Sequence, residues 1–342
     1  VNEGELIIQN TGTAFDSGTT TVASGATLTF DVTSGQAQLN NGGQTLQGAG
    51  TIKKTGAGKL LLGANGQTIN ISQSAGALFD VQEGEVRNEY FQGNWSANQG
   101  SLNVAGGALV QLWDSDITVD ALTGSGTIDK GQNNTHTLTV GVANHTSSTD
   151  NPYFTGNTAT FSGTIDNGTG TINLTKVGSG TQVLSGLNTY TGLTTVSDGT
   201  LRLQADGSGQ GAFSGAARDY AIASGATLNM DGNHGWASGT SNINGEGTLS
   251  ITGGVFGNET PNSPKGDGRN INLSMDSGAL IDVASGATLV TGGWADLNWT
   301  GNKADLTVNG TFDAWDGQTV MVDALNGSGT IDKRQGSNTV NM

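Results

Sequence analysis

The sequence predicts an all-β protein that folds as a parallel β-helix, a β-solenoid with coils of about 25 residues. A short phrase recurs along the chain, in which Gly and one or two small residues precede Leu or Ile. Its glycines are Gly25, Gly50, Gly76, Gly100 and Gly126, at steps of 25, 26, 24 and 26 residues. A β unit that repeats at this interval is too short for a sandwich and has the length of one solenoid coil.

The strands themselves are predicted from the alternation of polar and apolar residues. Residues 171–175 (TINLT) and 200–203 (TLRL) alternate with the period of two that is typical of half-buried strands. Clusters of Gly, Asn, Asp and Ser separate such segments and supply the turns. Because no segment shows helical periodicity with capping signals, we expect no helices, a thin aliphatic core and stacked Asn and Thr side chains.

Composition excludes several classes of function. The chain has 342 residues with 57 Gly, no Cys and only 12% charged residues, and its net charge is −16. Such an acidic chain without a basic patch is not expected to bind nucleic acid. Without Cys there is no disulfide, thiolate zinc site or Cys nucleophile. No stretch approaches the length of a membrane helix, so we expect no membrane insertion by this segment.

In addition to the short repeat, the chain contains a longer duplication. Residues 120–130 (DALTGSGTIDK) and 323–333 (DALNGSGTIDK) are identical at ten of eleven positions. We interpret residues 1–130 and 196–333 as two copies of one block of about 200 residues, joined by connecting coils at 131–195. The sequence thus predicts one continuous solenoid over residues 1–342, as part of a longer tandem array.

Two stretches break this rhythm, residues 141–159 and 253–270, and they contain all three prolines. Proline cannot donate to an interior strand ladder, so we expect loops that leave the solenoid. Loops on a rigid scaffold often carry binding residues, which makes Tyr153 and Arg269 candidates for ligand binding. The alternative is that both stretches are tolerated surface insertions.

Residues 170–203 carry a more specific pattern. It consists of KxGxG at 176–180, NTYTG at 188–192 and GTL at 199–201, and a weaker match starts with KTGAG at 54–58. This region resembles the autotransporter-associated β-strand repeat of passenger regions in bacterial type V secreted proteins. The resemblance implies a right-handed β-helix that is extracellular or displayed on the bacterial cell surface.

Three carboxylates lie close together in sequence, Asp114, Asp116 and Asp120. Their oxygen atoms are suitable ligands for calcium, and paired carboxylates also serve polysaccharide-active enzymes, here with Arg87 or Arg269 as a cationic helper. The simpler interpretation is a solvated acidic face. We assign no catalytic residue and no cofactor, and keep calcium at these aspartates as an alternative.

Tryptophans occupy matching places in the two blocks. Trp95 and Trp299 each follow Asn, whereas Trp113 and Trp315 each precede Asp. An exposed indole gives a large apolar face on which a sugar ring can stack, so these four residues are candidate ligand-binding residues. The alternative is that they fill the core.

The sequence therefore favours a structural or adhesive segment of a long β-helical fibre, a stalk, spacer or adhesin without catalysis. Its partners would be neighbouring repeats of the same chain, and surface glycans or other cells. The alternatives are a β-helical polysaccharide-active enzyme and a glycan-binding module. A segment cut from such a fibre is expected to expose apolar coil faces at its ends.

Overall fold

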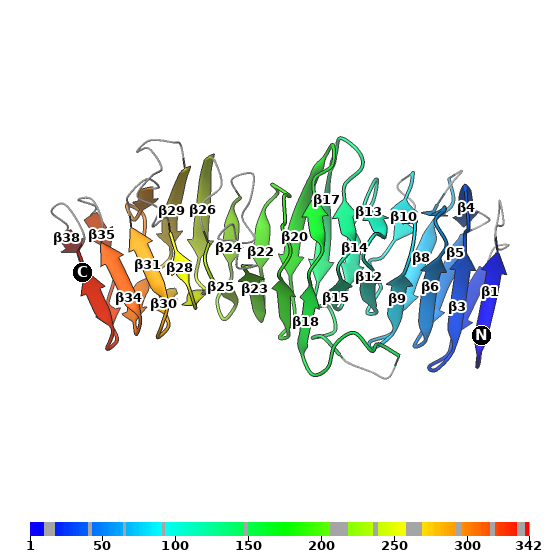
Figure 1. The fold of residues 1–342 in the computed structure, drawn as a ribbon, viewed down its shortest axis with the longest axis horizontal. Coiled ribbons are helices and arrows are strands. Elements are labelled where there is room, and N and C mark those ends of the chain that lie inside the picture. Colours follow the sequence, from blue (N-terminus) through cyan, green and yellow to red (C-terminus); the bar gives the residue numbers. More distant parts are fainter. Residues whose placement is uncertain are drawn as a thin grey trace. The chain divides into compact units, whose positions relative to one another are not determined.

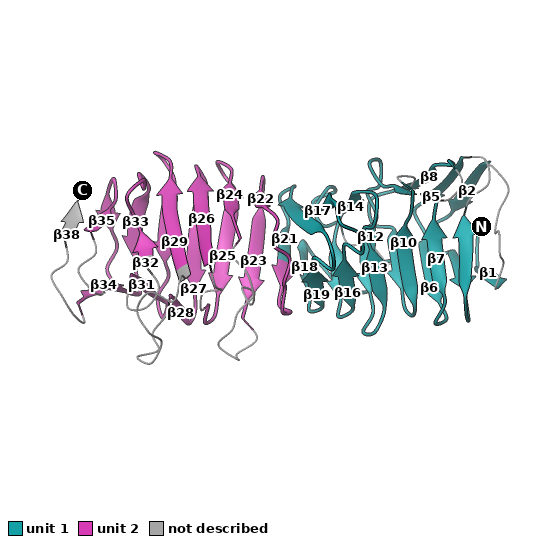
Figure 2. Cartoon of the chain, turned by 90° about the horizontal axis from the view of Figure 1, so that it is seen from above, with its two compact units in different colours: residues 1–182 teal, residues 183–342 magenta. Residues whose placement is uncertain are grey.

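The computed structural model describes residues 1–9, 18–39, 43–63, 66–90, 93–146, 150–205, 218–234, 239–257, 269–291, 296–314, 319–333 and 339–341. The chain divides into two compact units, Val1–Gln182 and Val183–Met342 (Figure 2). Each unit is treated by itself below, and one continuous solenoid over the whole chain stays a prediction.

Unit 1 consists of parallel strands that return to the same sheets once per coil (Figure 1). Its first sheet contains β1 (Glu5–Gln9), β3 (Thr27–Asp31), β6 (Thr51–Thr55), β9 (Leu78–Val81), β12 (Ser101–Val104), β15 (Leu122–Gly124) and β18 (Thr158–Phe161). Its second contains β4 (Gln36–Leu39), β7 (Lys59–Leu62), β10 (Glu85–Asn88), β13 (Leu109–Gln111), β16 (Thr127–Asp129) and β19 (Thr164–Asp166). The remaining strands form one sheet of β2 (Gly18–Val22), β5 (Gln44–Gly48), β8 (Ile69–Gln73) and β11 (Gly93–Asn94), and another of β14 (Ile117–Val119), β17 (Thr135–Val140) and β20 (Thr171–Lys176).

Unit 2 follows the same plan, and β21 (Thr181–Leu184) lies at the division between the units. Its first sheet contains β23 (Thr200–Gln204), β25 (Thr227–Asp231), β27 (Thr248–Thr252), β30 (Leu280–Val283), β33 (Asp305–Val308) and β36 (Leu325–Asn326). A second contains β22 (Thr194–Val196), β24 (Tyr220–Ile222), β26 (Gly239–Gly245), β29 (Arg269–Met275) and β32 (Asp296–Asn298). The others are β28 (Val255–Phe256), β31 (Thr288–Thr291), β34 (Thr311–Ala314) and β37 (Thr330–Asp332), and the pair β35 (Thr319–Met321) and β38 (Thr339–Asn341).

Strand pairing places apolar residues of successive coils on top of one another. In unit 1, Leu28 pairs with Ile52, which is 24 residues further along, and Ile52 pairs with Phe79; all three are buried. In unit 2, Leu228, Leu249 and Ile281 form a corresponding buried row. No helix occurs among the described residues. The predicted parallel β-solenoid is therefore confirmed, whereas the handedness of its coil stays a prediction.

Inward-facing residues are open to solvent where a row ends. Leu6 in β1 pairs with the fully buried Leu28, yet Leu6 itself is 45% exposed. Ile331 in β37 pairs with the buried Phe312 and is 48% exposed. In each unit, the last position of such a row is thus an apolar side chain that the described residues leave partly exposed.

The lysine of the KxGxG pattern is an inward-facing residue. Lys54 lies in register between Phe30 and Val81 and is fully buried. Its ammonium group donates to the backbone carbonyls of Thr55, Gly56 and Glu83 at 2.7, 2.6 and 3.2 Å. Burial outweighs the attraction of Asp31 and Glu83 and lowers the pKa of Lys54 to about 8, so the amine is mainly charged at neutral pH.

The stronger match repeats this arrangement in unit 1. The buried Lys176 donates to the carbonyls of Val177 and Gly178 at 2.7 and 2.6 Å. Gly178 has φ of 66°, a conformation that favours glycine. A Cβ atom on Gly180 would lie 2.1 Å from Nδ1 of His145. The pattern therefore specifies a turn whose backbone carbonyls accept hydrogen bonds from a buried ammonium group.

The NTYTG segment belongs to the core of unit 2. Tyr190 is buried, and its hydroxyl lies 2.8 Å from that of Thr194. The buried guanidinium of Arg218 lies over the Tyr190 ring, 4.5 Å from its centroid, and donates to the carbonyls of Tyr190 and Asn188. These residues stabilise a chain reversal, which gives the motif a structural role.

Polar side chains also stack between coils. In unit 1, Asn94 donates to Asn70 at 2.8 Å, and Asn70 donates to Thr45 at 3.4 Å. In unit 2, Asn298 donates to Asn272 and Asn272 to Asn242, at 3.1 and 2.8 Å. Such ladders fix the register because a slip of one residue turns every side chain to the opposite face.

We predict that replacing Lys54 by Met destabilises unit 1, because three partly buried carbonyls lose their donor. A buried group left without a partner costs about 1–3 kcal/mol. Denaturant unfolding followed by circular dichroism measures the change. The neighbouring Lys53→Met variant, at a partly exposed position, is the matched control and is expected to change the free energy of unfolding by less than about 0.5 kcal/mol. Equal effects of the two substitutions would contradict this role of Lys54.

Candidate functional site

The chain leaves the coil between β17 and β18, where the described residues 141–146 and 150–157 lie outside the strands. We call residues 141–157, of which 141–146 and 150–157 are described, the excursion. Its first turn is held by Asp120, which is completely buried. The carboxylate accepts the backbone N–H groups of Ala143, His145 and Thr146 at 2.8, 2.8 and 2.6 Å.

Two further contacts hold the excursion to unit 1. The carboxylate of Asp150 accepts a hydrogen bond from the Ser24 hydroxyl at 2.6 Å and from the Gly25 N–H at 2.7 Å. The side chain of Phe154 is buried with Ala121 and Ala159. Residues 125 positions apart in sequence therefore lie side by side, and the excursion crosses the first sheet.

A shallow groove of about 290 Å³ lies between the excursion and the first sheet of unit 1. The excursion contributes Asp150, Pro152 and Tyr153. The sheet and its turns contribute Gly25, Thr27, Thr51, Lys53, Leu78 and Asp80. The lining thus combines one aromatic ring with two carboxylates, an ammonium group and two hydroxyls.

Two of the lining residues, Lys53 and Asp80, belong to a row of polar residues on the first sheet. Strand pairing aligns Thr29, Lys53, Asp80, Asn103 and Thr123 across five successive strands. Asn103 donates to the Asp80 carboxylate at 2.8 Å, and the Thr123 hydroxyl donates to the Asn103 side chain at 3.1 Å. Asp80 is buried and is therefore held in one orientation.

Tyr153 is attached to this row through its hydroxyl. The phenol lies 3.3 Å from both Asp80 oxygens and accepts a hydrogen bond from the Gln82 amide at 2.8 Å. Burial of the hydroxyl and the charge of Asp80 raise the pKa of Tyr153, so the phenol keeps its proton at neutral pH. The residue is nevertheless 42% exposed. One end of the ring is fixed and the remainder is accessible.

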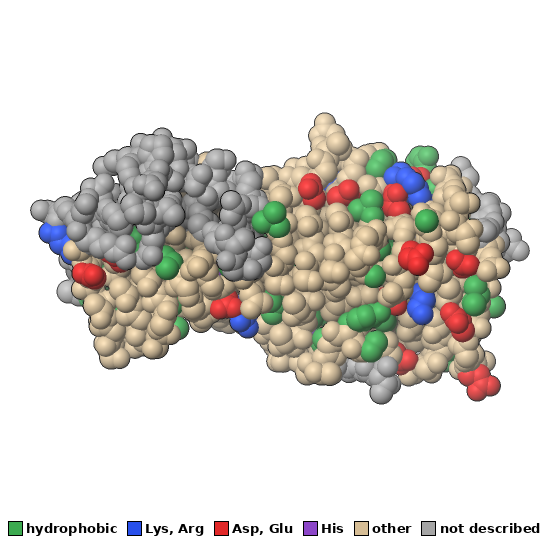
Figure 3. All heavy atoms as spheres, viewed as in Figure 1, with side chains coloured by type: hydrophobic (Ala, Val, Ile, Leu, Met, Phe, Trp, Pro, Cys, Tyr) green, Lys and Arg blue, Asp and Glu red, His purple; other side chains and the backbone are tan. Residues whose placement is uncertain are grey.

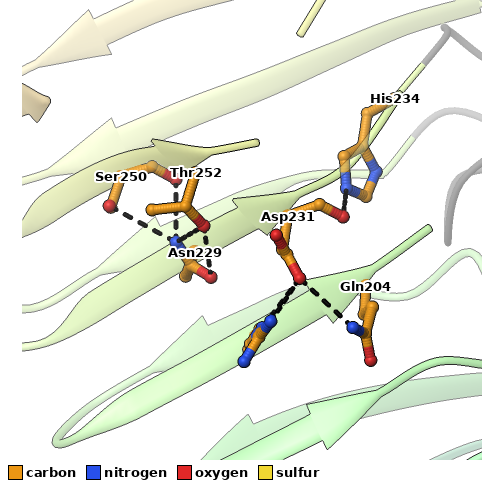
Figure 4. A network of polar contacts seen from close by, with 7 residues as sticks. Gln204, Asn229, Asp231, His234, Ser250 and Thr252 are labelled. Carbon is orange, nitrogen blue, oxygen red and sulfur yellow. Dashed lines mark hydrogen bonds and ion pairs between the residues drawn. The ribbon is translucent and has the colours of Figure 1, made fainter. Parts of the chain in front are cut away.

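Unit 2 has a polar network on its corresponding sheet (Figure 4). Asn229 donates to the hydroxyls of Ser250 and Thr252 at 3.3 and 2.8 Å. Asp231 accepts from Gln204 at 3.3 Å and pairs with Arg202. These groups bind one another across strands, so we assign the network a structural role.

The three aspartates that the sequence selected do not form a shared site. Asp114 accepts from the Tyr90 N–H at 3.0 Å, Asp116 lies 2.9 Å from Nδ1 of His136, and Asp120 holds the excursion. The described residues contain no group of three or more His, Asp or Glu side chains arranged to hold a metal ion. Each carboxylate faces its own partners, and calcium at these aspartates stays a prediction.

The polysaccharide-cleaving alternative named Arg87 or Arg269 as a cationic helper, and the structure shows Arg87 engaged by groups of the protein. Arg87 is paired with Glu85 and Glu89 at 2.6 and 3.0 Å, and its guanidinium lies 3.9 Å from the centre of the Trp113 ring. Trp113 itself is partly buried and has φ of 48°. This arrangement occupies both Arg87 and one face of the Trp113 indole.

Trp95 and Trp299 lie in the core and are each 1% exposed. Trp95 donates to the Asn88 side chain at 3.0 Å and packs 5.3 Å from Phe79, and Trp299 packs 5.9 Å from Phe312. The suggestion that these two indoles stack on sugars is thereby corrected, since neither ring is accessible. Their matching places reflect the same core position in the two blocks.

Two candidates lie outside what the structure describes. Trp315 is not among the described residues, and of Arg269 only the backbone is described, at the start of β29. Tyr153 is therefore the sequence-selected ligand-binding candidate that the structure places on a groove. Sequence reasoning missed Lys53 and Asp80, because only strand pairing and the fold of the excursion over the first sheet bring them to Tyr153. It also missed Asp150, which lies three residues before Tyr153 but gives no local signal of its contact with Ser24 and Gly25.

The surface around these features carries little charge. On the face drawn in Figure 3, acidic and basic side chains are scattered over the described residues, and uncharged polar side chains and backbone cover most of the area. No helix in the described part of the chain is long and apolar enough to cross a membrane.

Comparisons with known proteins agree with the fold. Residues 174–203 match the family model of the passenger-associated-transport-repeat. Over 324 residues the chain is 30% identical to the adhesin BmaC autotransporter of Brucella suis biovar 1 (strain 1330). The match covers 91% of this chain and 8% of that protein, so the chain spans a small part of its relative. No solved structure matches. The predicted resemblance to autotransporter passenger repeats is thus confirmed.

We predict that acid destabilises the anchoring of the excursion through His145. Burial lowers the pKa of His145 below 6.5, and the charge of Lys176 lowers it further against the opposing effect of Asp120. The His145 imidazole therefore takes up a proton more readily in the unfolded chain than in the folded chain. With respect to His145, the free energy of unfolding keeps its full value above pH 6.5, and it falls as the pH drops below that value.

Denaturant unfolding at pH 7.5, 6.5 and 5.5 tests this prediction. The His145→Asn variant should show a smaller loss of stability on acidification than the parent chain, because asparagine does not titrate and tolerates the positive φ of 57° at this position. A His145→Asn variant that loses stability as steeply as the parent would exclude His145 as the cause.

Proposed function

We propose that this chain is a non-catalytic, adhesive spacer within a long β-solenoid passenger that is secreted or displayed on the bacterial surface. The observation that carries the proposal is the similarity to an autotransporter adhesin along 91% of the chain, on a fold built of repeating parallel coils. That relative is an adhesin, and its adhesive role is extended to this chain as a proposal.

The physical properties of the solenoid support a spacer. Each coil buries its apolar row on its neighbours, so added coils lengthen the protein without enlarging a core. The open coil faces at Leu6 and Ile331 are suited to cover by further coils of the same kind. The acidic balance of the chain disfavours anionic partners and limits self-association.

The arrangement of the acidic residues supports the absence of catalysis. Asp114 and Asp120 are buried and accept hydrogen bonds from backbone N–H groups, which are structural roles. Hydrolysis of a glycosidic bond requires two carboxyl groups that flank a substrate. Among the described residues, the groove at Tyr153 contains Asp80 and Asp150, and both are already engaged by donors of the protein.

We predict that beads coated with the 342-residue chain attach to cultured animal epithelial cells. Attachment should exceed that of albumin-coated beads at least about tenfold and should be competed by the soluble chain, as expected for a surface with specific contacts. Counting attached beads after washing measures it. Attachment no greater than that of albumin-coated beads would contradict the adhesive part of the proposal and leave only the spacer role. Release of reducing sugar from surface polysaccharides by the same chain would contradict the non-catalytic part.

A further inference from the structure

We infer that the groove between the excursion and the first sheet of unit 1 is a binding site for a single neutral sugar ring of a surface glycan. This inference deepens the proposed adhesive function and rests on it. It starts from four side chains of the groove, Tyr153, Asp80, Asp150 and Lys53.

The size of the groove limits the ligand. Its volume of about 290 Å³ lies at the lower end of sites for small molecules, which span about 300–1,000 Å³. The groove is also open, since it is formed by one segment lying on a sheet. It therefore suits one ring at the end or on a branch of a glycan, with the rest of the chain in solvent.

The chemistry of the lining selects a sugar. A pyranose has an apolar face of C–H groups and an edge of hydroxyls. Tyr153 supplies an accessible aromatic face that is held at its hydroxyl by Asp80 and Gln82, so little conformational entropy is lost on binding. The hydroxyls of Thr27 and Thr51 and the charged groups of Asp150 and Lys53 supply donors and acceptors for the hydroxyl edge.

Charge disfavours an anionic sugar. Two carboxylates face one ammonium group within the groove, and the whole chain has a net charge of −16. No hydrogen bond or ion pair engages Lys53 Nζ among the described residues, although it lies in register beside Asp80. Its ammonium group can therefore donate to a ligand hydroxyl.

The wall that carries Tyr153 is fixed in place before a ligand binds. Asp120 holds the start of the excursion through three N–H groups, and Asp150 holds its middle through Ser24 and Gly25. The groove is thus preformed by contacts that do not involve the sugar. Preformed sites lose less free energy to ordering on binding.

Calorimetric titration of the 342-residue chain tests the inference. The probes are the methyl glycosides of glucose, galactose, mannose and N-acetylglucosamine, with glucuronic acid as the anionic comparison. At least one neutral glycoside should bind with a dissociation constant on the order of 1 mM, which is typical of a small ligand in an open site. Binding of glucuronic acid alone, or of none of the five probes, would overturn the inference.

Variants locate the binding. Tyr153→Asn should weaken it at least about tenfold through loss of the aromatic face, and Lys53→Met should weaken it several-fold. Tyr90→Asn is the matched control, because Tyr90 is an exposed tyrosine of unit 1 outside the groove, and it should bind as the parent does. Circular dichroism verifies that each variant is folded. If Tyr153→Asn and Lys53→Met, both folded, bind like the parent, the sugar site lies elsewhere.

Bead attachment separates this inference from the proposed function. If parent-coated beads attach and Tyr153→Asn beads attach equally, the adhesive function stands and the groove is not its site. If the sugar binds in solution but no beads attach, the groove assignment stands and the adhesive role fails. If attachment and sugar binding are lost together in Tyr153→Asn but kept in Tyr90→Asn, both are supported.

Discussion

The structure depends on the stacking of each coil on the one before it, with residues in register. A coil of this length has no core of its own, because its inward side chains are buried only when the equivalent side chains of the next coil cover them. The row from Leu28 through Ile52 to Phe79 shows the result, and Leu6 shows the exposure of an uncovered position. Lys54 follows the same constraint. Its aliphatic carbons continue an apolar row, and its ammonium group donates to the backbone carbonyls of a turn.

The same constraint distinguishes the residues that maintain the fold from the residues that could recognise a ligand. Inward rows, stacked asparagines and the turn lysines recur in several coils and serve the fold, so they can carry little specificity. The excursion between β17 and β18 departs from the repeat and is fixed on the first sheet by Asp120 and Asp150. It converts a flat, polar sheet face into a groove with an aromatic wall. A solenoid of repeating coils gains a distinct surface in this way without disturbing its core.

Periodic features could be predicted from sequence, and features that depend on contacts between distant coils could not. The alternation in residues 171–175 and the regular Gly phrase predict strands and coil length, because both express local geometry. The sequence leaves two interpretations for Trp95 and Trp299, because an indole at a repeated position suits either a core or a surface. Asp80 gives no local signal at all: its role depends on its register beside Lys53 and on a tyrosine 73 residues away. The spacing of Asp114, Asp116 and Asp120 suggests a cluster, whereas in the structure each carboxylate contacts different partners.

In-register stacking is tested most directly by disulfide formation between engineered cysteine pairs, which the absence of native cysteine makes unambiguous. Thr45 and Asn70 are paired on neighbouring strands, which places their Cα atoms about 5 Å apart and within disulfide range. Ser72 lies two residues further along, about 8 Å from Thr45 and beyond that range. The register predicts rapid oxidation of the Thr45→Cys, Asn70→Cys chain and little oxidation of the Thr45→Cys, Ser72→Cys chain. Equal oxidation of the two chains, or the reverse order, would contradict the stacking on which the fold and the groove depend.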